Sequence, residues 1–377
     1  MKEKHLHIVC LDVPWPVDYG GVFDLFFKIK CLFEAGVKIH LHCFEYGRGQ
    51  QEELNKYCVD VNYYPRTTGH QAFCFSMPHI VCSRNNPLLL QNLQQDDYPI
   101  LMEGIHCTYF LHSGDLEGRK VFVRLHNVEY LYYDHLAKTT SSFLKKLYYQ
   151  RESKLLKKYE ASLKDKAIFF TVNDTDKMVF ENEFGFSTIQ NLPPFLPEYE
   201  PVWNGEKGCY CLYHGNLSVD ENEKAVIWLL ENVFSTVDIP IIIAGKKPSD
   251  LLKKIAEQRP QTCLVENPGD EEMQELIKKA QVNILPSFNN TGIKLKLINA
   301  LFNGRHCLVN SAAVEGTGLS ECCTVANSQQ CMRSELEKLY YQPYTFYQFQ
   351  HRGEILSHMF SNRENAEKMV DWIWNSE

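Results

Sequence analysis

A loop and helix start within residues 281–310 carry the residue types that could bind an anion. The segment opens with an apolar run, 282–285, typical of a buried strand, and passes through a polar loop into apolar residues at helical spacing. Asn290 or Thr291 is predicted to cap this helix, and Gly304 to end it. Unpaired backbone N–H groups and the positive end of the helix dipole coincide at such a start, so it attracts phosphate.

Two lysines, Lys294 and Lys296, lie in the first turns of this predicted helix. A cation at that position opposes the helix dipole, so the lysines do not serve helix stability. An anion bound at the helix start would explain them. A pair of solvated lysines on an ordinary α/β helix is an equally good explanation from the local residue types alone.

The N-terminal residues predict a β-α-β start. Residues 5–11 are typical of a first strand, 22–33 of a helix and 37–44 of a second strand. The complete G-x-G-x-x-G fingerprint is absent, so a dinucleotide site is not predicted. Gly20 and Gly21 still let the backbone approach a ligand closely, and a plain tight turn is the alternative.

The proline-rich stretch 193–197 divides the chain of 377 residues, because its prolines continue neither a helix nor a central strand. We therefore predict an N-terminal acceptor-side domain at 1–195, a linker at 196–208 and a C-terminal donor-nucleotide domain at 209–350. The last helices, 351–377, could return to the N-terminal domain.

Short strands alternate with helices in the second half, which predicts a parallel sheet covered on both faces. The predicted fold class is α/β, with two Rossmann-like doubly wound domains facing a cleft. Gly215, Lys246 and the 290–296 segment each follow a predicted strand. The carboxyl ends of parallel strands share one edge of a sheet, so these groups are expected to converge, and they suit a diphosphate.

The composition excludes several classes of protein. A net charge of -8 argues against a nucleic-acid binder. The fourteen cysteines lack metal-ligand spacing and are expected to be reduced. We expect no signal peptide and no membrane-spanning segment, and therefore a cytoplasmic protein.

One helical stretch, 142–166, has more basic than acidic residues on an amphipathic pattern. Such a helix can lie on an anionic membrane surface, which would place the protein at the inner face of the membrane. A surface helix with a solvated basic face is the alternative interpretation.

Several segments together resemble the GT-B glycosyltransferases of family 4, which use sugar nucleotides. Residues 291–304 are similar to that family's G-x-K-L-K-x-L-E-A segment, and this is the most specific likeness. The other similar segments are 213–218, 18–21, 126–129, 171–176 and 314–316. The resemblance covers most of the chain and is weak between residues 50 and 98.

The resemblance implies site residues in three groups. Catalytic roles fall on His126, Lys246 and Lys294. Donor binding falls on Gly20, Gly21, Gly215, Asn216, Thr291, Gly292, Lys296, Asn299 and Glu315. Acceptor-side contacts are expected from Asp24, Asn127 and Glu129. From its spacing, Glu129 either orients His126 or is an acid in the first turn of the following helix. No metal ligand is expected.

This chain departs from the family at two positions. The family usually has two glutamates eight positions apart, near the donor sugar and on the nucleotide ribose, where this chain has Thr291 and Asn299. A neutral asparagine hydrogen-bonds a hydroxyl about half as strongly as a carboxylate does. Donor affinity and donor identity are therefore expected to differ from those of relatives.

The expected activity is a retaining, metal-independent hexosyl transfer from a nucleotide-sugar such as a UDP- or GDP-hexose, without other cofactors. The acceptor would be a hydroxyl of a glycan or lipid-linked glycan, in surface polysaccharide biosynthesis. We expect a monomer or weak dimer. The alternatives are a nucleotide-sugar 2-epimerase and a non-catalytic, transferase-like binding subunit.

Overall fold

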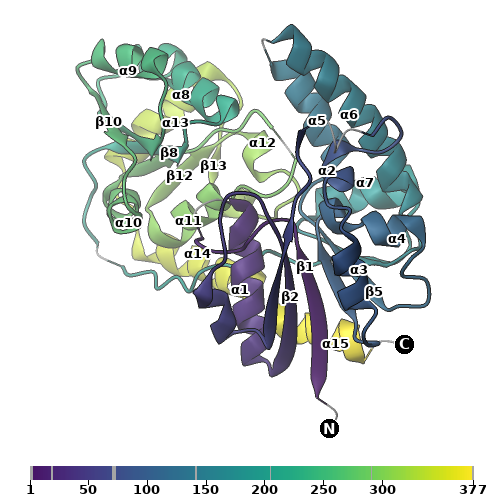
Figure 1. Cartoon of the computed structure of the whole chain (residues 1–377). Coiled ribbons are helices and arrows are strands. Elements are labelled where there is room, and N and C mark those ends of the chain that lie inside the picture. The colour runs from purple at the N-terminus through teal and green to yellow at the C-terminus, as the bar shows by residue number, and fades with distance from the viewer. Residues whose placement is uncertain are drawn as a thin grey trace. The chain divides into compact units, whose positions relative to one another are not determined.

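The computed structural model describes residues 3–17, 20–69, 74–140, 142–203, 205–289 and 291–375. The chain forms two compact units, which are described separately. Unit 1 comprises Met1–Pro197 and Phe360–Glu377, and unit 2 comprises Glu198–Met359. The predicted class, two α/β domains with doubly wound parallel sheets, is confirmed (Figure 1).

Unit 1 is built on a seven-stranded parallel sheet in the order β3-β2-β1-β4-β5-β6-β7. The order reverses between β1 and β4, which is where ligands bind in doubly wound sheets. The strands are β1 (Lys4–Cys10), β2 (Val37–Glu45), β3 (Asp60–Pro65), β4 (Ile100–Glu103), β5 (Val121–Leu125), β6 (Ile168–Thr171) and β7 (Ile189–Asn191).

Helices cover both faces of this sheet and bury two hydrophobic cores. One core packs α1 and α15 together, so the C-terminal helix belongs to unit 1. The helices are α1 (Gly20–Glu34), η1 (Glu52–Lys56), α2 (His79–Cys82), α3 (Pro87–Leu93), η3 (Ile105–Cys107), α4 (Tyr109–Ser113), α5 (Glu129–Thr139), α6 (Phe143–Ser162), α7 (Asp174–Phe184) and α15 (Asn362–Trp374).

Unit 2 has a six-stranded parallel sheet in the order β10-β9-β8-β11-β12-β13. Its strands are β8 (Cys211–Asn216), β9 (Ile241–Lys246), β10 (Thr262–Glu266), β11 (Val282–Ile284), β12 (His306–Val309) and β13 (Thr324–Val325). Its helices are α8 (Asp220–Asn232), α9 (Asp250–Glu257), α10 (Asp270–Lys279), α11 (Leu295–Asn303), α12 (Ser311–Val314), η4 (Ser320–Cys322), α13 (Gln329–Tyr341) and α14 (Phe346–Met359).

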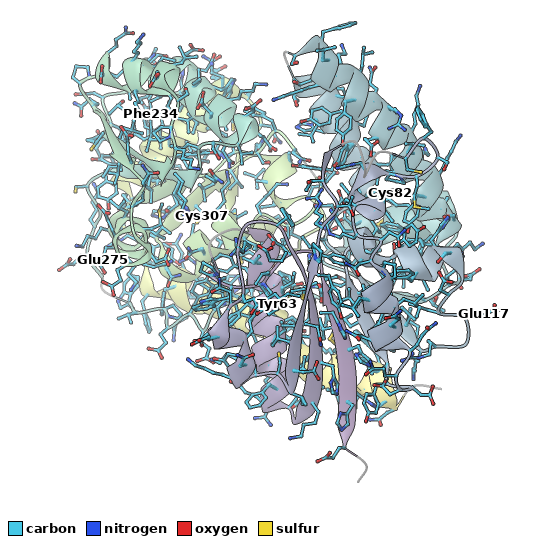
Figure 2. The ribbon with its side chains drawn as sticks, viewed as in Figure 1. Tyr63, Cys82, Glu117, Phe234, Glu275 and Cys307 are labelled. Atoms are coloured by element: carbon cyan, nitrogen blue, oxygen red, sulfur yellow. The ribbon has the colours of Figure 1, made fainter. Side chains whose placement is uncertain are left out.

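Side chains pack densely within each unit (Figure 2). Cys307 on β12 is buried inside unit 2, whereas Glu275 on α10 points outward at its rim. No helix in the described ranges combines the length and apolar character needed to cross a bilayer.

Three local predictions are corrected by the structure. α11 begins at Leu295 with Lys294 at its N-cap position, and no side chain caps it, so the predicted Thr291 cap is wrong. Asn290, the other predicted cap, lies outside the described residues. α1 begins at Gly20 rather than at residue 22, and Gly215 with Asn216 ends β8 rather than forming a loop. β8 is longer than predicted because Gly215 and Asn216 still pair with β9.

A row of histidines occupies one face of β1 and β2. His7 Nδ1 lies 2.9 Å from His42 Nε2, His42 Nδ1 lies 2.7 Å from Tyr64 Oη, and His7 Nε2 lies 3.0 Å from Asp96. Nearer the surface, His5 Nδ1 and His40 Nε2 are 3.0 Å apart. The period-2 pattern places all four side chains on one face of the paired strands.

Acid is expected to destabilise unit 1 through His42. Burial, with the charges of His7 and His40, lowers the pKa of His42 to about 3, while Asp96 partly opposes this. The unfolded chain, with an ordinary histidine pKa near 6.5, then binds more protons below that pH, so stability falls as the pH drops. Because His42 is protonated in the unfolded chain but not in the folded one, the free energy of unfolding should fall by about 2 kcal/mol between pH 7.5 and pH 5.

Denaturant unfolding of the wild type and His42→Phe at both pH values measures this effect. The variant should lose less stability on acidification. His358→Gln, an exposed histidine on α14, should behave as the wild type does. An identical acid sensitivity in wild type and His42→Phe would contradict the prediction.

Candidate functional site

The carboxyl edge of the unit 2 sheet brings together most of the residues predicted to bind the donor. β8 and β9 pair in parallel, so that Gly215 lies opposite Gly245 and Asn216 opposite Lys246. A Cβ at Gly245 would clash with the Gly215 carbonyl oxygen and with Leu217. Two glycines therefore let the ends of the two strands approach closely.

Lys296, in the first turn of α11, reaches back to β8. Its Nζ donates to Asn222 Oδ1 at 2.7 Å and to Tyr213 Oη at 3.0 Å, and lies 4.7 Å from the Tyr213 ring centroid. The side chain also passes Gly215, where a Cβ would stand 3.6 Å from Lys296 Cδ. Three elements thus hold one ammonium group beside the end of β8.

Burial lowers the pKa of Lys296 to about 8, with Glu221 opposing this and Lys294 adding to it. The mutual repulsion shows that Lys294 and Lys296 lie within electrostatic reach of each other. An anion between them would relieve the repulsion and raise the pKa of Lys296.

The loop before α11 is braced by its own polar groups. Thr291 N and Oγ1 both donate to Asn289 Oδ1 at 2.9 Å, and Lys294 Nζ donates to Thr291 O at 2.6 Å. Gly292 has φ +63°, a left-handed conformation that favours glycine. These bonds tie Thr291 to Asn289 and Lys294 to Thr291, beside a helix start that no side chain caps.

The other predicted residues of unit 2 that the structure describes make no hydrogen bond with the Lys296 ammonium group. The side chain of Lys246 is exposed and makes no hydrogen bond or ion pair with any described residue. Asn299 is half-buried on α11, and its Oδ1 accepts a hydrogen bond from Asn303 Nδ2 at 2.8 Å. Asn216 Oδ1 accepts from Ser218, and Glu315 is exposed after α12.

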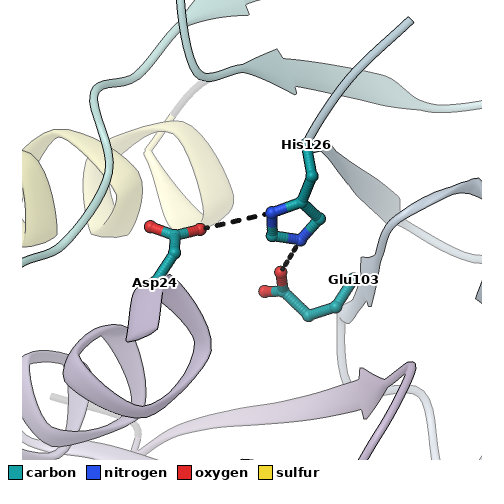
Figure 3. A group of neighbouring side chains, drawn as sticks. All are labelled: Asp24, Glu103 and His126. Atoms are coloured by element: carbon teal, nitrogen blue, oxygen red, sulfur yellow. Dashed lines mark hydrogen bonds and ion pairs between the residues drawn. The ribbon is translucent and has the colours of Figure 1, made fainter. Parts of the chain in front are cut away.

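In unit 1, a buried network of charges lies at the carboxyl ends of β4 and β5 (Figure 3). His126 directly follows β5, and its Nε2 lies 3.0 Å from Glu103 Oε2. Its Nδ1 lies 4.0 Å from Asp24 Oδ2, on α1. The imidazole is thus held between two carboxylates from different elements, with 17% of its side chain exposed.

Two cations balance those carboxylates. Lys28 Nζ lies 2.9 Å from Asp24 Oδ2 and 2.8 Å from Glu103 Oε1. Arg124 donates two hydrogen bonds to Asp24, from Nε to Oδ2 at 3.0 Å and from Nη2 to Oδ1 at 3.2 Å. The backbone N–H of Phe195 donates to Asp24 Oδ1 at 2.8 Å, so this carboxylate ties three segments together.

These charges decide the protonation of the acids. Burial alone would raise the pKa of Asp24, but Arg124, Lys28 and His126 hold it well below its usual range. Burial likewise opposes ionisation of Glu103, and Lys28 with His126 lowers its pKa. Both acids are therefore ionised at neutral pH.

The ligand atoms of Asp24, Glu103 and His126 lie within 4.8 Å of one another, a spacing that could hold a metal ion. However, Lys28 and Arg124 already neutralise the two carboxylates. A divalent cation would have to displace the Lys28 ammonium, so the network does not favour a resident metal.

Other predicted residues of unit 1 take different places. Gly20 and Gly21 form the first residues of α1. Of the two expectations for Glu129, the first-turn acid is confirmed, because Glu129 begins α5. The other is wrong, because Glu103 makes the hydrogen bond to His126. Burial raises the pKa of Glu129 to about 7, opposed by a hydrogen bond from Asn127 and reinforced by Asp176.

Sequence reasoning missed several residues of both sites. Lys28 follows Asp24 by one helical turn, which indicates an ion pair between them. Arg124 interrupts an apolar strand, which indicates a buried arginine with a partner. Tyr213 and Asn222 lay within a recognised segment, but only the structure shows that they hold Lys296.

Comparisons with known proteins agree with this architecture. Residues 208–340 match the family described as Glycosyl transferases group 1. The chain is 28% identical over 352 residues to a Klebsiella pneumoniae protein described as an uncharacterized 44.6 kDa protein in the cps region, covering 85% of this chain and 87% of that protein.

Two solved structures are similar over nearly the whole chain. Sucrose-phosphate synthase from Thermosynechococcus elongatus has 11% identity, 98% coverage of both chains and a TM-score of 0.72. An S. aureus TarM mutant in complex with fondaparinux, alpha-GlcNAc-glycerol and UDP has 11% identity, 100% coverage of both chains and a TM-score of 0.69. These likenesses show the fold, two Rossmann-like units of the GT-B class.

Proposed function

We propose that this chain is a glycosyltransferase that moves a hexose from a nucleotide-sugar to a hydroxyl of a glycan or lipid-linked glycan. The match of residues 208–340 to group 1 glycosyltransferases supports the reaction class. The similarity to a protein of a cps region supports a role in surface polysaccharide biosynthesis.

The gathering of cationic and amide groups at the carboxyl edge of unit 2 carries this proposal. Lys296 is held beside Gly215, Lys246 ends the neighbouring strand, and Lys294 sits at the start of α11. A diphosphate at this edge would meet ammonium groups together with the positive end of the α11 dipole.

In the proposed reaction, the bond between the anomeric carbon and the diphosphate oxygen breaks, and a bond from the acceptor oxygen to the anomeric carbon forms. The acceptor hydroxyl proton passes to the departing diphosphate. Lys246, Lys294 and the amides near Gly292 would stabilise the negative charge that develops on the leaving group. Lysine and amide groups can provide this stabilisation without a metal.

The finer features of the proposal extend to unit 1. His126 is proposed to contact the donor sugar or its developing charge, because Glu103 and Asp24 hold its ring between them. Retention of anomeric configuration and a UDP- or GDP-linked donor are part of the proposal. Asp24, Asn127 and Glu129 remain proposed acceptor-side residues.

The direct test is calorimetric titration of the full-length protein with nucleoside diphosphates and sugar nucleotides, in wild type and in Lys294→Ala. Saturable binding that Lys294→Ala weakens supports the proposal. Absence of binding by every nucleotide would refute it. Incubation with the donor alone distinguishes an epimerase, because only an epimerase would convert the donor sugar without an acceptor.

We also propose that helix α6 contacts an anionic membrane surface, where a lipid-linked acceptor would lie. Phe143 and Leu144, at its start, are 72% and 78% exposed. The acids of α6, Glu152 and Glu160, are both buried and accept backbone hydrogen bonds from other segments. The exposed charges of α6 are therefore all basic, beside an apolar tip.

Membrane binding should depend on the lysines at this tip. Lys145→Gln combined with Lys146→Gln should weaken binding to vesicles containing anionic lipid by about 30-fold, because each basic residue near such a surface contributes about 1 kcal/mol. Vesicle co-sedimentation measures this. The exposed pair of unit 2, Lys278→Gln with Lys279→Gln, is the matched control. Equal binding by both double variants, or equal binding of the wild type to zwitterionic vesicles, would contradict the proposal.

A further inference from the structure

Two arginines of unit 1 lie against the same aromatic ring. The guanidinium carbon of Arg66 is 4.6 Å from the Tyr46 ring centroid, and that of Arg84 is 5.9 Å from it. Two like charges so close together repel, and burial, with the charge of Arg66, lowers the pKa of Arg84. Such an arrangement is stable only where something offsets the repulsion.

Neither arginine has a carboxylate partner among the described residues. Arg84 is 3% exposed, and its Nε and Nη2 donate to Leu11 O at 3.1 and 2.8 Å, while Nη1 donates to Ile80 O at 2.7 Å. Arg66 is half-buried and donates from Nε to Ser83 Oγ at 3.1 Å. The guanidinium of Arg66 therefore keeps most of its N–H groups for a ligand.

Two acids, Asp12 and Glu129, lie within electrostatic reach of Arg84, but the hydrogen bonds of its guanidinium go to carbonyl oxygens and to neither carboxylate. Asp12 Oδ1 accepts the backbone N–H of Val13 at 2.8 Å. Buried charges in proteins are usually paired, so the two guanidinium groups leave a local excess of positive charge.

His106 adds a polar group to the same place. Its Nδ1 is buried, lies against Gly104 and has no hydrogen-bond partner in the described ranges. No described residue bonds its Nε2 either. Burial lowers the pKa of His106 well below its usual range, and the charges of Arg84, His126 and Arg66 lower it further. The ring is neutral and retains one N–H to donate.

The topology explains why these residues meet. Leu11 follows β1, Tyr46 follows β2, Arg66 follows β3, and His106 follows β4 by three residues. All therefore lie at the carboxyl edge of the unit 1 sheet, around the reversal of strand order between β1 and β4. His126, which follows β5, occupies the same edge.

We propose that Arg66, Arg84 and His106 form a binding site for an anionic group, a phosphate or carboxylate, carried by the acceptor. A guanidinium fork matches the planar pair of oxygens of either group. The assignment of this anion to the acceptor rests on the proposed function, whereas the site itself rests only on the unpaired charges of unit 1. The substrate class is therefore a phosphorylated or acidic glycan acceptor.

The test is calorimetric titration of the full-length protein with inorganic phosphate and with glycerol phosphate. Every protein in this titration also carries Lys294→Ala, which weakens competing phosphate binding in unit 2. Arg66→Gln should reduce the affinity at least about tenfold, because it removes charge-assisted hydrogen bonds. Arg66→Lys should give an intermediate loss. Arg84 is left unchanged because its bonds join α2 to the end of β1.

Lys38→Gln, an exposed lysine on β2, removes the same charge elsewhere in unit 1 and should leave the affinity unchanged. Equal phosphate affinities with and without Arg66, or no phosphate binding at all, would overturn the proposal. If Arg66→Gln loses vesicle binding but keeps its phosphate affinity, Arg66 binds lipid headgroups instead. That result would also overturn the proposal. If nucleotides fail to bind but Arg66-dependent phosphate binding persists, the transferase proposal fails while the anion site stands.

Discussion

Replacing Lys294 by alanine is expected to lower donor turnover by about 100- to 1,000-fold, the usual cost of removing one group that stabilises developing charge. Lys294 stands at the N-cap position of α11, where the dipole of the helix is positive. A cation is unfavourable there unless an anion lies between it and the helix. The departing diphosphate supplies that anion, so the loss should fall mainly on turnover.

The measurement is release of nucleoside diphosphate from the sugar nucleotide, with hydrolysis of the donor as the background reaction. Lys294→Arg retains a charge and should recover part of the rate. Lys254→Ala, which removes an exposed lysine on α9, is the matched control and should keep the full rate.

Lys294 also has a structural bond, which the experiment must separate from catalysis. Its Nζ donates to Thr291 O at 2.6 Å, so alanine at this position could loosen the loop. The melting temperature without nucleotide reports on that effect. A variant that melts as the wild type does but turns over the donor at the wild-type rate would exclude Lys294 from leaving-group stabilisation.

The positions of strands and helices could be predicted where apolar periodicity was strong. The run before Pro286, the helix that ends at Gly304 and the strand after it are all present. Gly304 is required by packing, because a Cβ there would meet Ala300 O at 2.7 Å and clash with the Asn283 side chain. Helix starts were harder to predict, since α11 begins at Leu295 without any capping side chain.

The candidate site of unit 2 could be predicted because its residues follow strands and carry charge. In unit 1, the partners of the site residues could not be predicted. The partner of His126 is Glu103, from a neighbouring strand and distant in sequence, whereas the sequence pointed to Glu129, three residues away. Partners that meet only through the order of strands in a sheet leave no local pattern. The same holds for Arg66, Arg84 and His106, which come from separate loops.

Asp24→Asn is expected to lower the free energy of unfolding by about 3–5 kcal/mol, because it leaves buried cations without their counter-charge. Asp24 is 3% exposed, and its carboxylate accepts hydrogen bonds from Arg124, Lys28 and the Phe195 backbone. The substituted amide keeps the shape of the side chain but brings its own N–H groups toward two donors. The change therefore tests charge rather than packing.

The exposed pair Arg363–Glu367 provides the control. Its atoms lie 3.0 Å apart, but the two side chains are 89% and 58% exposed. Glu367→Gln should therefore cost less than about 1 kcal/mol. Denaturant unfolding at pH 7.5 compares the two variants with the wild type.

The pH dependence gives a second readout on the same variant. The pKa of Asp24 is lowered in the folded state, so its contribution is complete above the unfolded pKa, near 3.9, and is lost as the pH falls through the folded value. Asp24→Asn should therefore lose part of the wild-type acid sensitivity below about pH 4. If the two substitutions cost the same at pH 7.5, the buried network contributes no more than a surface pair, and Lys28 and Arg124 must be neutralised by the carbonyl groups and Glu103 around them.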